Sequence, residues 1–451
     1  MSNLTTTYLS MGRYSEAEVL GKEAVQFQKI VLGEQHPDTL LSMSNLDATY
    51  FYMGRYNEAE ALKKEVMQIQ RTVLGEQHPA TLNSMSNLAL TYLSMGRYSE
   101  AELLGKEVLQ LRATVLGELH PDTLTSMSNL VIIYSQMGRQ NEAEALNKEV
   151  LQMQKTVLGE QHPHTLTAMS NLALTYLSMG RYSEAELLEK EVLQLRATVL
   201  GELHPDTLTS MSNLVIIYSQ MGRQNEAEAL NKEVLQMQKT VLGEQHPHTL
   251  TAMSNLAFIY YKTERYNEAE ILWEHVKHLQ KTVLGEQHPG TLMSMSNLAS
   301  NYSAMERYNE AELLGKEILQ IRKTVLGEQH PDTLTSMSNL AVTYSLMGRH
   351  NDAEALKKEA LQLQKTVLGE QHPSTLTSMC NLALDYSAMD RCDEAEILGK
   401  EVLQIRKTVL GVRHPSTLNS MSTLALNYSK MGRYNEAESL QQEVARMKAF
   451  I

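Results

Sequence analysis

Histidine, cysteine and acidic side chains are the residues of this chain that could hold a metal ion or take part in catalysis. His275 and His278 are three residues apart and share one face of a predicted helix, with Glu274 beside them. Zinc sites in proteins use three or four such ligands, and no third ligand is evident near this pair. We therefore interpret the pair as part of a solvated helix face.

The other histidines recur instead of clustering. A His-Pro pair occurs ten times, from residues 36–37 to residues 414–415, always at an interval of 42 residues. Because each copy repeats the same residues, we assign these histidines to junctions between repeats, through packing or hydrogen bonding. Glu100 and Glu102 recur in the same way and are interpreted as helix-start residues. No Ser/His/Asp pattern stands out from the repeat, so the sequence predicts neither an enzyme nor a cofactor or metal site.

Composition limits the compartment and the classes of partner. Cys380 and Cys392 are the only cysteines in 451 residues, which fits a reducing compartment better than a disulfide framework. No apolar run approaches the length that crosses a bilayer, and the N-terminus lacks a signal-peptide pattern. The net charge of −13 is spread evenly, without a basic stripe that would neutralise phosphates. We therefore expect a cytoplasmic protein that binds neither nucleic acid nor membrane.

Each 42-residue unit predicts two helices separated by a tight turn. In one unit, the first helix runs from Pro79 to about Met95, and Gly96 ends it at positive φ. A capping box of Ser99 and Glu102 is expected to start the second helix. Apolar residues recur at helical spacing in both segments: Leu82, Met85, Leu88, Tyr92 and Met95 in the first, and Ala101, Leu104, Val108, Leu111 and Val115 in the second. Neither helix can bury its stripe alone, so stability must come from stacking on both flanking units.

The period extends over the whole chain and predicts a single array, residues 1–451, of about eleven units. A truncated first unit, residues 1–32, precedes units that start near residues 37, 79, 121, 163, 205, 247, 289, 331, 373 and 415. Residues 85–173 and 169–257 are identical, except that Gly105 becomes Glu189. The first unit lacks its His-Pro start and no polar capping helix follows the last unit. We therefore expect both ends to be cut from something longer, or to join in end-to-end self-association.

Two stretches of each unit carry a family resemblance. Residues 87–92, NLALTY, followed by residues 96–101, GRYSEA, resemble the tetratricopeptide repeat. The long second helix and the His-Pro-Asp-Thr junction are similar to the 42-residue form of kinesin light chains. Similar arrays form the C-terminal sensor of some fungal and bacterial nucleotide-binding immune-type receptors. The resemblance implies an all-α, right-handed superhelical solenoid of antiparallel helix pairs.

The chain departs from the family at three positions. The bulky aromatic residue early in the first helix is a methionine here, as at Met43, Met85 and Met127. The aromatic residue expected in the second helix is replaced in most units, by residues such as Gly21, Lys63, Gly105 and Asn147, and only Trp273 restores it. The usual turn glycine is replaced in units seven, eight and ten, by Glu264, Glu306 and Asp390. A non-glycine residue at positive φ costs about 1 kcal/mol, so we expect altered turns in those units.

The resemblance also implies where a ligand binds. First helices of such arrays line a concave groove in which an extended peptide or a helix lies. The asparagine just before the helix leucine faces this groove, and its amide can bond a peptide backbone. This asparagine ladder comprises Asn3, Asn45, Asn87, Asn129, Asn171, Asn213, Asn255, Asn297, Asn339 and Asn381, and Thr423 breaks it. An alternative stays open, in which the asparagine and the preceding serine bond a neighbouring repeat and only fix the stacking.

Sequence differences between the repeats are concentrated near the end of the first helix. Phe51, Tyr52, Phe258 and Tyr261 are candidate anchors for apolar side chains of a ligand, although drift and packing account for them equally well. Lys and Arg are absent from the asparagine positions and from the positions one turn earlier. The sequence therefore argues against a clamp for a C-terminal carboxylate.

These observations favour a scaffold or adaptor that presents a long groove to a protein or peptide partner. Two alternatives remain. In the first, the array is the recognition region of a larger NLR-like receptor or of a kinesin-light-chain-like cargo adaptor. In the second, it is a self-assembling structural array.

Overall fold

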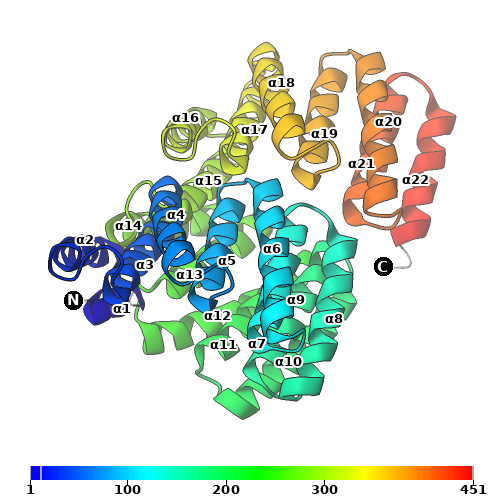
Figure 1. Ribbon diagram of the computed structural model, residues 1–451. Coiled ribbons are helices and arrows are strands. Elements are labelled where there is room, and N and C mark those ends of the chain that lie inside the picture. Colours follow the sequence, from blue (N-terminus) through cyan, green and yellow to red (C-terminus); the bar gives the residue numbers. More distant parts are fainter. Residues whose placement is uncertain (1, 11–12, 449–451) are drawn as a thin grey trace. The chain divides into compact units, whose positions relative to one another are not determined.

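The computed structural model describes residues 2–10 and 13–448, and all regular secondary structure in these ranges is α-helical. A shorter first helix and a longer second helix alternate along the chain and are joined by tight turns (Figure 1). Ten of the eleven first helices begin at the proline of a His-Pro pair. The all-α solenoid of helix pairs predicted from the period is therefore confirmed.

The first helices have the following bounds: α1 Ser2–Ser10, α3 Pro37–Tyr52, α5 Pro79–Ser94, α7 Pro121–Gln136, α9 Pro163–Ser178, α11 Pro205–Gln220, α13 Pro247–Lys262, α15 Pro289–Ala304, α17 Pro331–Leu346, α19 Pro373–Ala388 and α21 Pro415–Lys430. The second helices have these bounds: α2 Tyr14–Val31, α4 Tyr56–Val73, α6 Tyr98–Leu116, α8 Gln140–Leu158, α10 Tyr182–Leu200, α12 Gln224–Leu242, α14 Tyr266–Val283, α16 Tyr308–Val325, α18 His350–Val367, α20 Cys392–Val409 and α22 Tyr434–Lys448.

The chain divides into two compact units, Met1–Asn301 and Tyr302–Ile451. Within each unit, a first helix packs against the second helix of its own repeat and against the second helix of the repeat before. Several successive first helices also approach one another, as α9, α11 and α13 do, whereas no two successive second helices come as close in the described residues. The first helices therefore lie on the inside of the curvature. The prediction that residues 1–451 form one array stays a prediction.

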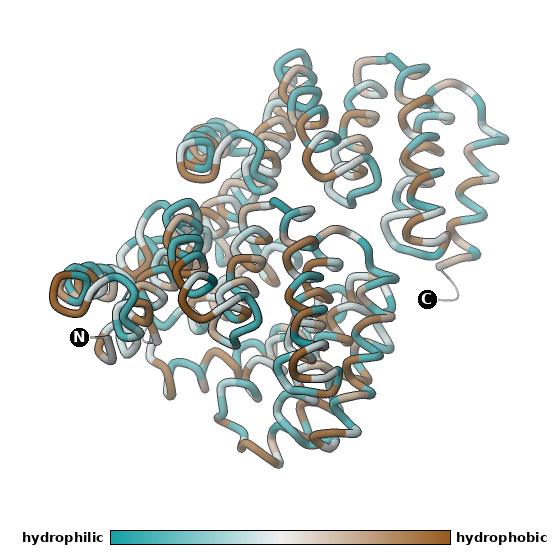
Figure 2. Tube along the Cα trace, in the orientation of Figure 1, coloured by the Kyte–Doolittle hydropathy of each residue, from teal (hydrophilic) through white to brown (hydrophobic). Residues whose placement is uncertain are grey.

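The core forms where one repeat stacks on the next. Leu82, Met85 and Val108 pack within one helix pair, whereas Leu88 and Tyr92 pack against Leu130 and Ile133 of the following repeat. Figure 2 shows hydrophobic and hydrophilic residues alternating along the helices. At the end of the second helix, the prediction that Val115 belongs to the buried apolar stripe was wrong. Val115 is exposed and Arg112 is buried in its place, because its guanidinium donates to the Asp122 carbonyl and the Ser126 hydroxyl of the next repeat.

The turn inside each repeat has the same backbone geometry with and without glycine. Gly96 has φ of 71°, and Glu264, Glu306 and Asp390 have φ of 59°, 60° and 60°. The closing hydrogen bond is also kept, because the Arg265 amide donates to the Tyr260 carbonyl at 2.9 Å, as the equivalent groups do in the other turns. The expectation of altered turns in units seven, eight and ten was therefore wrong, and the three acidic residues bear the strain of the left-handed conformation.

The predicted capping box was also wrong. Helix α6 begins at Tyr98, so Ser99 lies inside the first turn, and the N-cap is Arg97, which makes no side-chain capping bond. The Arg97 guanidinium instead donates to Glu100 and to Glu60 of the preceding second helix. The start of the second helix is therefore stabilised by ion pairs.

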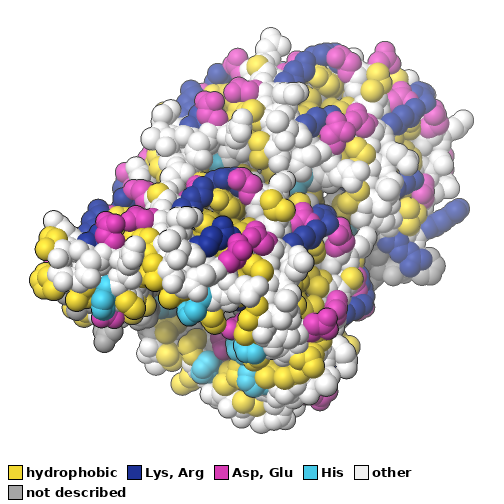
Figure 3. All heavy atoms as spheres, viewed as in Figure 1, with side chains coloured by type: hydrophobic (Ala, Val, Ile, Leu, Met, Phe, Trp, Pro, Cys, Tyr) yellow, Lys and Arg dark blue, Asp and Glu magenta, His cyan; other side chains and the backbone are white. Residues whose placement is uncertain are grey.

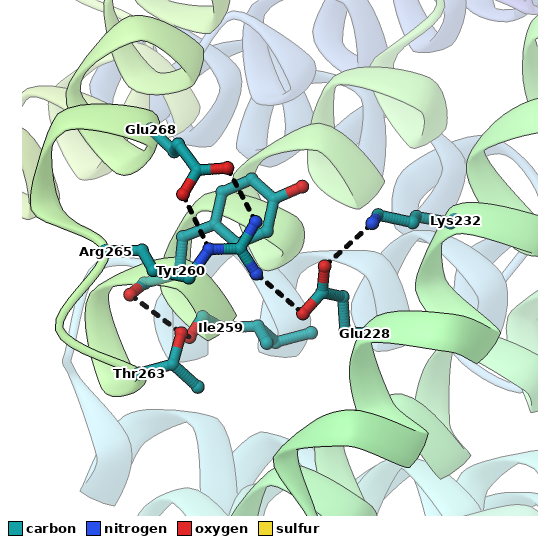
Figure 4. A network of polar contacts seen from close by, with 7 residues as sticks. All are labelled: Glu228, Lys232, Ile259, Tyr260, Thr263, Arg265 and Glu268. Carbon is teal, nitrogen blue, oxygen red and sulfur yellow. Dashed lines mark hydrogen bonds and ion pairs between the residues drawn. The ribbon is translucent and has the colours of Figure 1, made fainter.

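The same ion pairs connect each repeat with the one before it, and Figure 4 shows one copy. Arg265 lies over the Tyr260 ring and contacts Glu228 at 2.8 Å and Glu268 at 2.6 Å, while Lys232 contacts Glu228 at 2.7 Å. Burial acts to raise the pKa of Glu228, but Lys232 and Arg265 outweigh it, so the pKa is lowered. On the visible face, Lys and Arg side chains accordingly lie next to Asp and Glu side chains (Figure 3).

The recurring histidines are helix N-caps. The Nδ1 atom of His162 accepts a hydrogen bond from the His164 amide at 3.2 Å, while Pro163 occupies the first helical position, which needs no amide donor. The other His-Pro pairs repeat this bond with the amide two residues on, as His78 does with Ala80. The junction role predicted for the histidines is therefore a capping hydrogen bond.

Loss of one cap should cost measurable stability. We expect His162→Ala to lower the free energy of unfolding by about 1 kcal/mol, because the first turn of α9 loses its side-chain acceptor. His162→Asn should retain most of the stability, since asparagine caps helices well. Urea unfolding followed by circular dichroism checks both variants, and equal losses for Ala and Asn would contradict the capping role.

Candidate functional site

One face of each first helix stays exposed after packing. In α9 this face carries Thr167, Asn171, Leu174 and Ser178, whose spacing of four, three and four residues places them on one side of the helix. The buried residues of α9 lie on the other sides, toward α8, α10 and α11. We call the equivalent exposed strips of α3 to α21 the inner face, because the first helices lie inside the curvature.

The asparagine ladder lies on this inner face, but its members are used differently. Asn129 donates to the Ser86 hydroxyl of the preceding repeat at 3.1 Å, and Asn213 donates to the Ser170 hydroxyl at 3.0 Å. Both bonds agree with the alternative interpretation, in which the asparagine bonds a neighbouring repeat and fixes the stacking. For seven other members, no side-chain hydrogen bond is present in the described part of the chain: Asn45, Asn87, Asn171, Asn255, Asn297, Asn339 and Asn381. The side chain of Asn3 lies outside the described residues.

A row of aliphatic side chains lies beside the asparagines. Each comes three residues after the ladder position, which is asparagine in all of these helices except α21, and Leu174, Ile216 and Leu384 are 36, 37 and 43% exposed. This aliphatic row comprises Leu90, Ile132, Leu174, Ile216, Val342, Leu384 and Leu426, with Phe258 at the same position in α13. Sequence analysis missed the row. The available signal was an apolar residue that recurs outside the core stripe of the first helix.

The four predicted aromatic anchors form two groups in the unit Met1–Asn301. Phe51 packs edge-on against Tyr56, and Tyr52 stacks on Tyr14 of α2. In the seventh repeat, Phe258 stacks on Tyr261 at 6.2 Å between ring centroids, and Tyr261 also contacts Tyr266 and Trp273. Phe258 occupies the position of the aliphatic row in α13, whereas Tyr52 stacks on Tyr14 and remains 52% exposed.

Polar groups are buried where the family has its second-helix aromatic residue. Lys63 pairs with Asp47, and Lys357 pairs with Asp385 of the next first helix, and all four side chains are less than 10% exposed. Burial raises the pKa of Asp47 to about 6, and Lys63 opposes that rise. Trp273, the copy that keeps the aromatic ring, donates from its indole nitrogen to the Ser254 hydroxyl at 3.2 Å.

Glu189 is the single difference between the duplicated stretches, and it is fully buried. Its carboxylate accepts from the Ser170 hydroxyl at 2.9 Å and from the Asn213 amide at 3.3 Å. Burial raises the pKa of Glu189, and these hydrogen bonds only partly oppose the shift. Folding therefore disfavours the ionised form of Glu189 relative to the unfolded chain.

We expect Glu189→Gln to raise the free energy of unfolding at neutral pH by roughly 1–2 kcal/mol, since it removes a buried charge and keeps a group of the same shape. Because the folded pKa is raised, ionisation destabilises the native protein progressively as the pH rises above 4.5. The advantage of the variant should therefore disappear at more acidic pH. Urea unfolding at several pH values measures this. Glu186→Gln in the same helix should have the opposite sign at neutral pH, because Lys190 and Arg223 lower the pKa of Glu186.

A second exposed feature, of mixed polarity, lies on the outer side. A furrow between α4 and α6 is lined by Met67, Leu103 and Leu104 together with charged side chains such as Arg71 and Glu107. Leu103 is 72% exposed, and its equivalent in α10, Leu187, is 73% exposed. This outer furrow is the alternative surface against which the inner face has to be tested.

His275 and His278 lie in α14 outside both surfaces. His275 Nε2 is 3.7 Å from a carboxylate oxygen of Glu244. Among the described residues, no group of three or more His, Cys, Asp or Glu side chains is placed to hold a metal ion. In those same residues, no helix combines the length and apolar character that a bilayer span requires.

Family models identify the repeats. Two models described as tetratricopeptide repeat match residues 48–114, 248–324, 314–366, 346–408 and 386–449, and residues 1–38, 123–164, 165–206 and 207–248. The chain belongs to the tetratricopeptide repeat family. Comparison with the curated proteins gives no match.

Solved structures add kinesin light chain-like relatives. The nearly identical TPR-like repeats of a putative kinesin light chain from Podospora anserina are 31% identical to this chain, with 46% of this chain and 97% of that chain covered and a TM-score of 0.39. BtubC (BKLC) from P. vanneervenii is 22% identical, covering 52% of this chain and 92% of that one, with a TM-score of 0.41. A Rap protein complexed with Competence and Sporulation Factor is 11% identical, covers 82% and 98%, and has a TM-score of 0.54. Arrays of this family are in general scaffolds that bind protein or peptide partners.

Proposed function

We propose that this chain is a scaffold that binds an uncharged, partly aliphatic segment of a partner protein along its inner face. The observation that carries this proposal is the chemistry of that face. Over ten repeats, its four positions contain only two charged residues, Lys262 and Lys430, although the chain has 93 acidic and basic residues. A charged segment placed there would lose hydration without gaining a partner of opposite charge.

Two repeating features support an extended segment as the ligand. The seven asparagine side chains without an internal hydrogen bond offer both a donor and an acceptor to an unpaired peptide backbone. The aliphatic row beside them offers apolar contacts, which contribute about 25 cal/mol for each Å² removed from water. Together they supply polar recognition of the main chain and apolar recognition of side chains in most repeats.

The alternatives from the sequence do not gain the same support. Membership in an NLR-like receptor or a kinesin-light-chain-like cargo adaptor concerns the parent protein, and it is compatible with a binding groove. End-to-end self-association, a cytoplasmic location and the lack of catalytic activity stay predictions.

Selection from a library of random displayed peptides tests the proposal without knowledge of the natural partner. We expect the selected peptides to be depleted in Asp, Glu, Lys and Arg, to be rich in Leu, Ile and Val, and to compete with one another. Peptides dominated by one sign of charge would contradict an uncharged inner face as the binding surface.

A further inference from the structure

One contact in the unit Met1–Asn301 breaks the rule that repeats touch only their neighbours. The Nε2 atom of His288 is 2.7 Å from the main-chain carbonyl of Tyr52, although 236 residues separate the two along the chain. His288 ends the linker after the seventh unit, and Tyr52 ends the first helix of the second unit. Five complete units lie between them along the sequence.

The contact is built from stacked rings. Tyr52 stacks on Tyr14 with 5.9 Å between ring centroids and an angle of 8°, and Tyr14 stacks on His288 with 6.2 Å and 13°. Tyr14 is buried. Figure 1 shows α2 and α3, which carry the two tyrosines, beside α14, whose end leads into His288.

Backbone also packs closely at this point. Gly54, in the turn after Tyr52, lies against the ring of Pro289, and a Cβ atom added to Gly54 would overlap Pro289 Cδ and Cγ. The equivalent Gly222 has nearly the same φ, 77° against 73°, and an added Cβ would meet no atom within 4 Å. The lack of a side chain at residue 54 is therefore needed for the contact.

Residues at the contact differ from their copies elsewhere. Where α3 has Tyr52, the other first helices have Ser, Gln, Lys, Ala or Leu. Two residues after His288, Gly290 replaces the Asp, Ala, His or Ser of the other junctions, and a Cβ there would approach His288 Nδ1 to 3.1 Å. The deviations fall where the two distant repeats meet.

We propose that Tyr14, Tyr52, Gly54, His288 and Pro289 form a latch that closes units two to seven into a ring and so restricts entry to their inner face. The ring closure is a property of the chain alone. Its effect on entry rests on the proposed function, because it matters only if the inner face binds a ligand.

The latch requires neutral His288. Nδ1 accepts from the Gly290 amide at 3.0 Å, so the proton of the neutral ring must be on Nε2, where it is donated to the Tyr52 carbonyl. Protonation would place a second proton on Nδ1, which could then no longer accept the hydrogen bond from the Gly290 amide. The other ionisable groups around the ring are Tyr14, Tyr52, Arg55 and Glu286, and Arg55 is already paired with Glu18 and Glu58.

The direction of the pH effect follows from burial. Burial lowers the pKa of His288 from 6.5, and the bond to Tyr52 opposes that shift in part. A histidine whose folded pKa is lowered stabilises the closed form above 6.5 and loses that contribution as the pH falls through the lowered value. The closed latch should therefore become less stable as the pH falls below 6.5.

A distance measurement on the whole chain tests the latch. Spin labels are attached to cysteines introduced at the exposed residues Gln68 of α4 and Thr282 of α14. Cys380→Ser and Cys392→Tyr remove the native thiols and restore the residues of equivalent positions. Pulsed electron paramagnetic resonance at about pH 7.5 should give one narrow distance distribution, which becomes longer and broader at about pH 5.5.

Matched variants separate the latch from local folding. Gly54→Glu should lengthen the distance by several ångströms, whereas Gly222→Glu should leave it unchanged, because Glu264 and Glu306 show that this turn accepts glutamate. His288→Asn keeps an N-cap residue and should give the open distance at both pH values. Equal distributions for Gly54→Glu and Gly222→Glu would overturn the latch, and an unchanged wild-type distance in acid would overturn its pH dependence. Neither result depends on ligand binding.

Discussion

A single carboxylate on the inner face should weaken binding of the selected peptides strongly. Leu174→Asp and Ile216→Asp are each expected to weaken binding by about 2 kcal/mol or more, roughly 30-fold. The reason is that the ligand would cover a charge for which this face has no partner. Fluorescence anisotropy with a labelled selected peptide measures the affinity.

The control for this experiment lies on the outer side, at the position in α10 that is equivalent to Leu103 of the outer furrow. Leu187→Asp places the same charge on α10 at a leucine that is 73% exposed, so it should leave the affinity within about twofold. Thermal unfolding should be similar for all three variants, since the replaced side chains are partly solvated. If Leu187→Asp weakened binding as much as Leu174→Asp, the result would contradict the inner face as the sole binding surface and would implicate the outer side.

Breaking a buried ion pair between repeats should have the largest effect on stability. Lys357 of α18 and Asp385 of α19 are 4 and 7% exposed, and Lys357 also donates to the Ser345 hydroxyl at 3.2 Å. Lys357→Met leaves Asp385 buried without its cation, which is expected to cost about 3–5 kcal/mol in the free energy of unfolding. Urea unfolding followed by circular dichroism measures the loss.

Two further variants show whether the loss comes from the stranded carboxylate. Lys357→Met combined with Asp385→Thr, the residue that Thr343 supplies in the preceding repeat, should recover most of the stability. Lys358→Met removes an exposed lysine from the same helix and should cost less than about 1 kcal/mol. A double variant as unstable as Lys357→Met would contradict this interpretation.

The sequence predicted the helices well because each is set by local chemistry that repeats. Proline at the first helical position and glycine after the turn determine where helices begin and end, as at Pro79 and Gly96. The capping box at Ser99 was wrong because the N-cap is Arg97, two residues earlier, where an ion pair from Arg97 to Glu60 of the preceding repeat stabilises the start. A contact with another repeat cannot be read from local propensity.

The candidate site was predicted only in part, for the same physical reason. The position of the asparagine ladder on the inner face followed from the resemblance, but the difference between Asn213, which bonds Ser170, and Asn171, which has no such partner in the described residues, depends on how two repeats stack. The exposure of Leu174 depends on which helix faces the packing leaves open. The contact of Tyr52 with His288 depends on how far the stacked repeats curve, which no single repeat determines.

The central claim is that a ligand lies against the inner face. A photo-reactive amino acid, p-benzoylphenylalanine, placed at residue 174 or at residue 187 in separate chains tests it directly, because both positions are exposed aliphatic sites on neighbouring helices. The account predicts that a selected peptide crosslinks on illumination to residue 174 and that excess unlabelled peptide suppresses the crosslink. Crosslinking at residue 187 with none at residue 174 would contradict it.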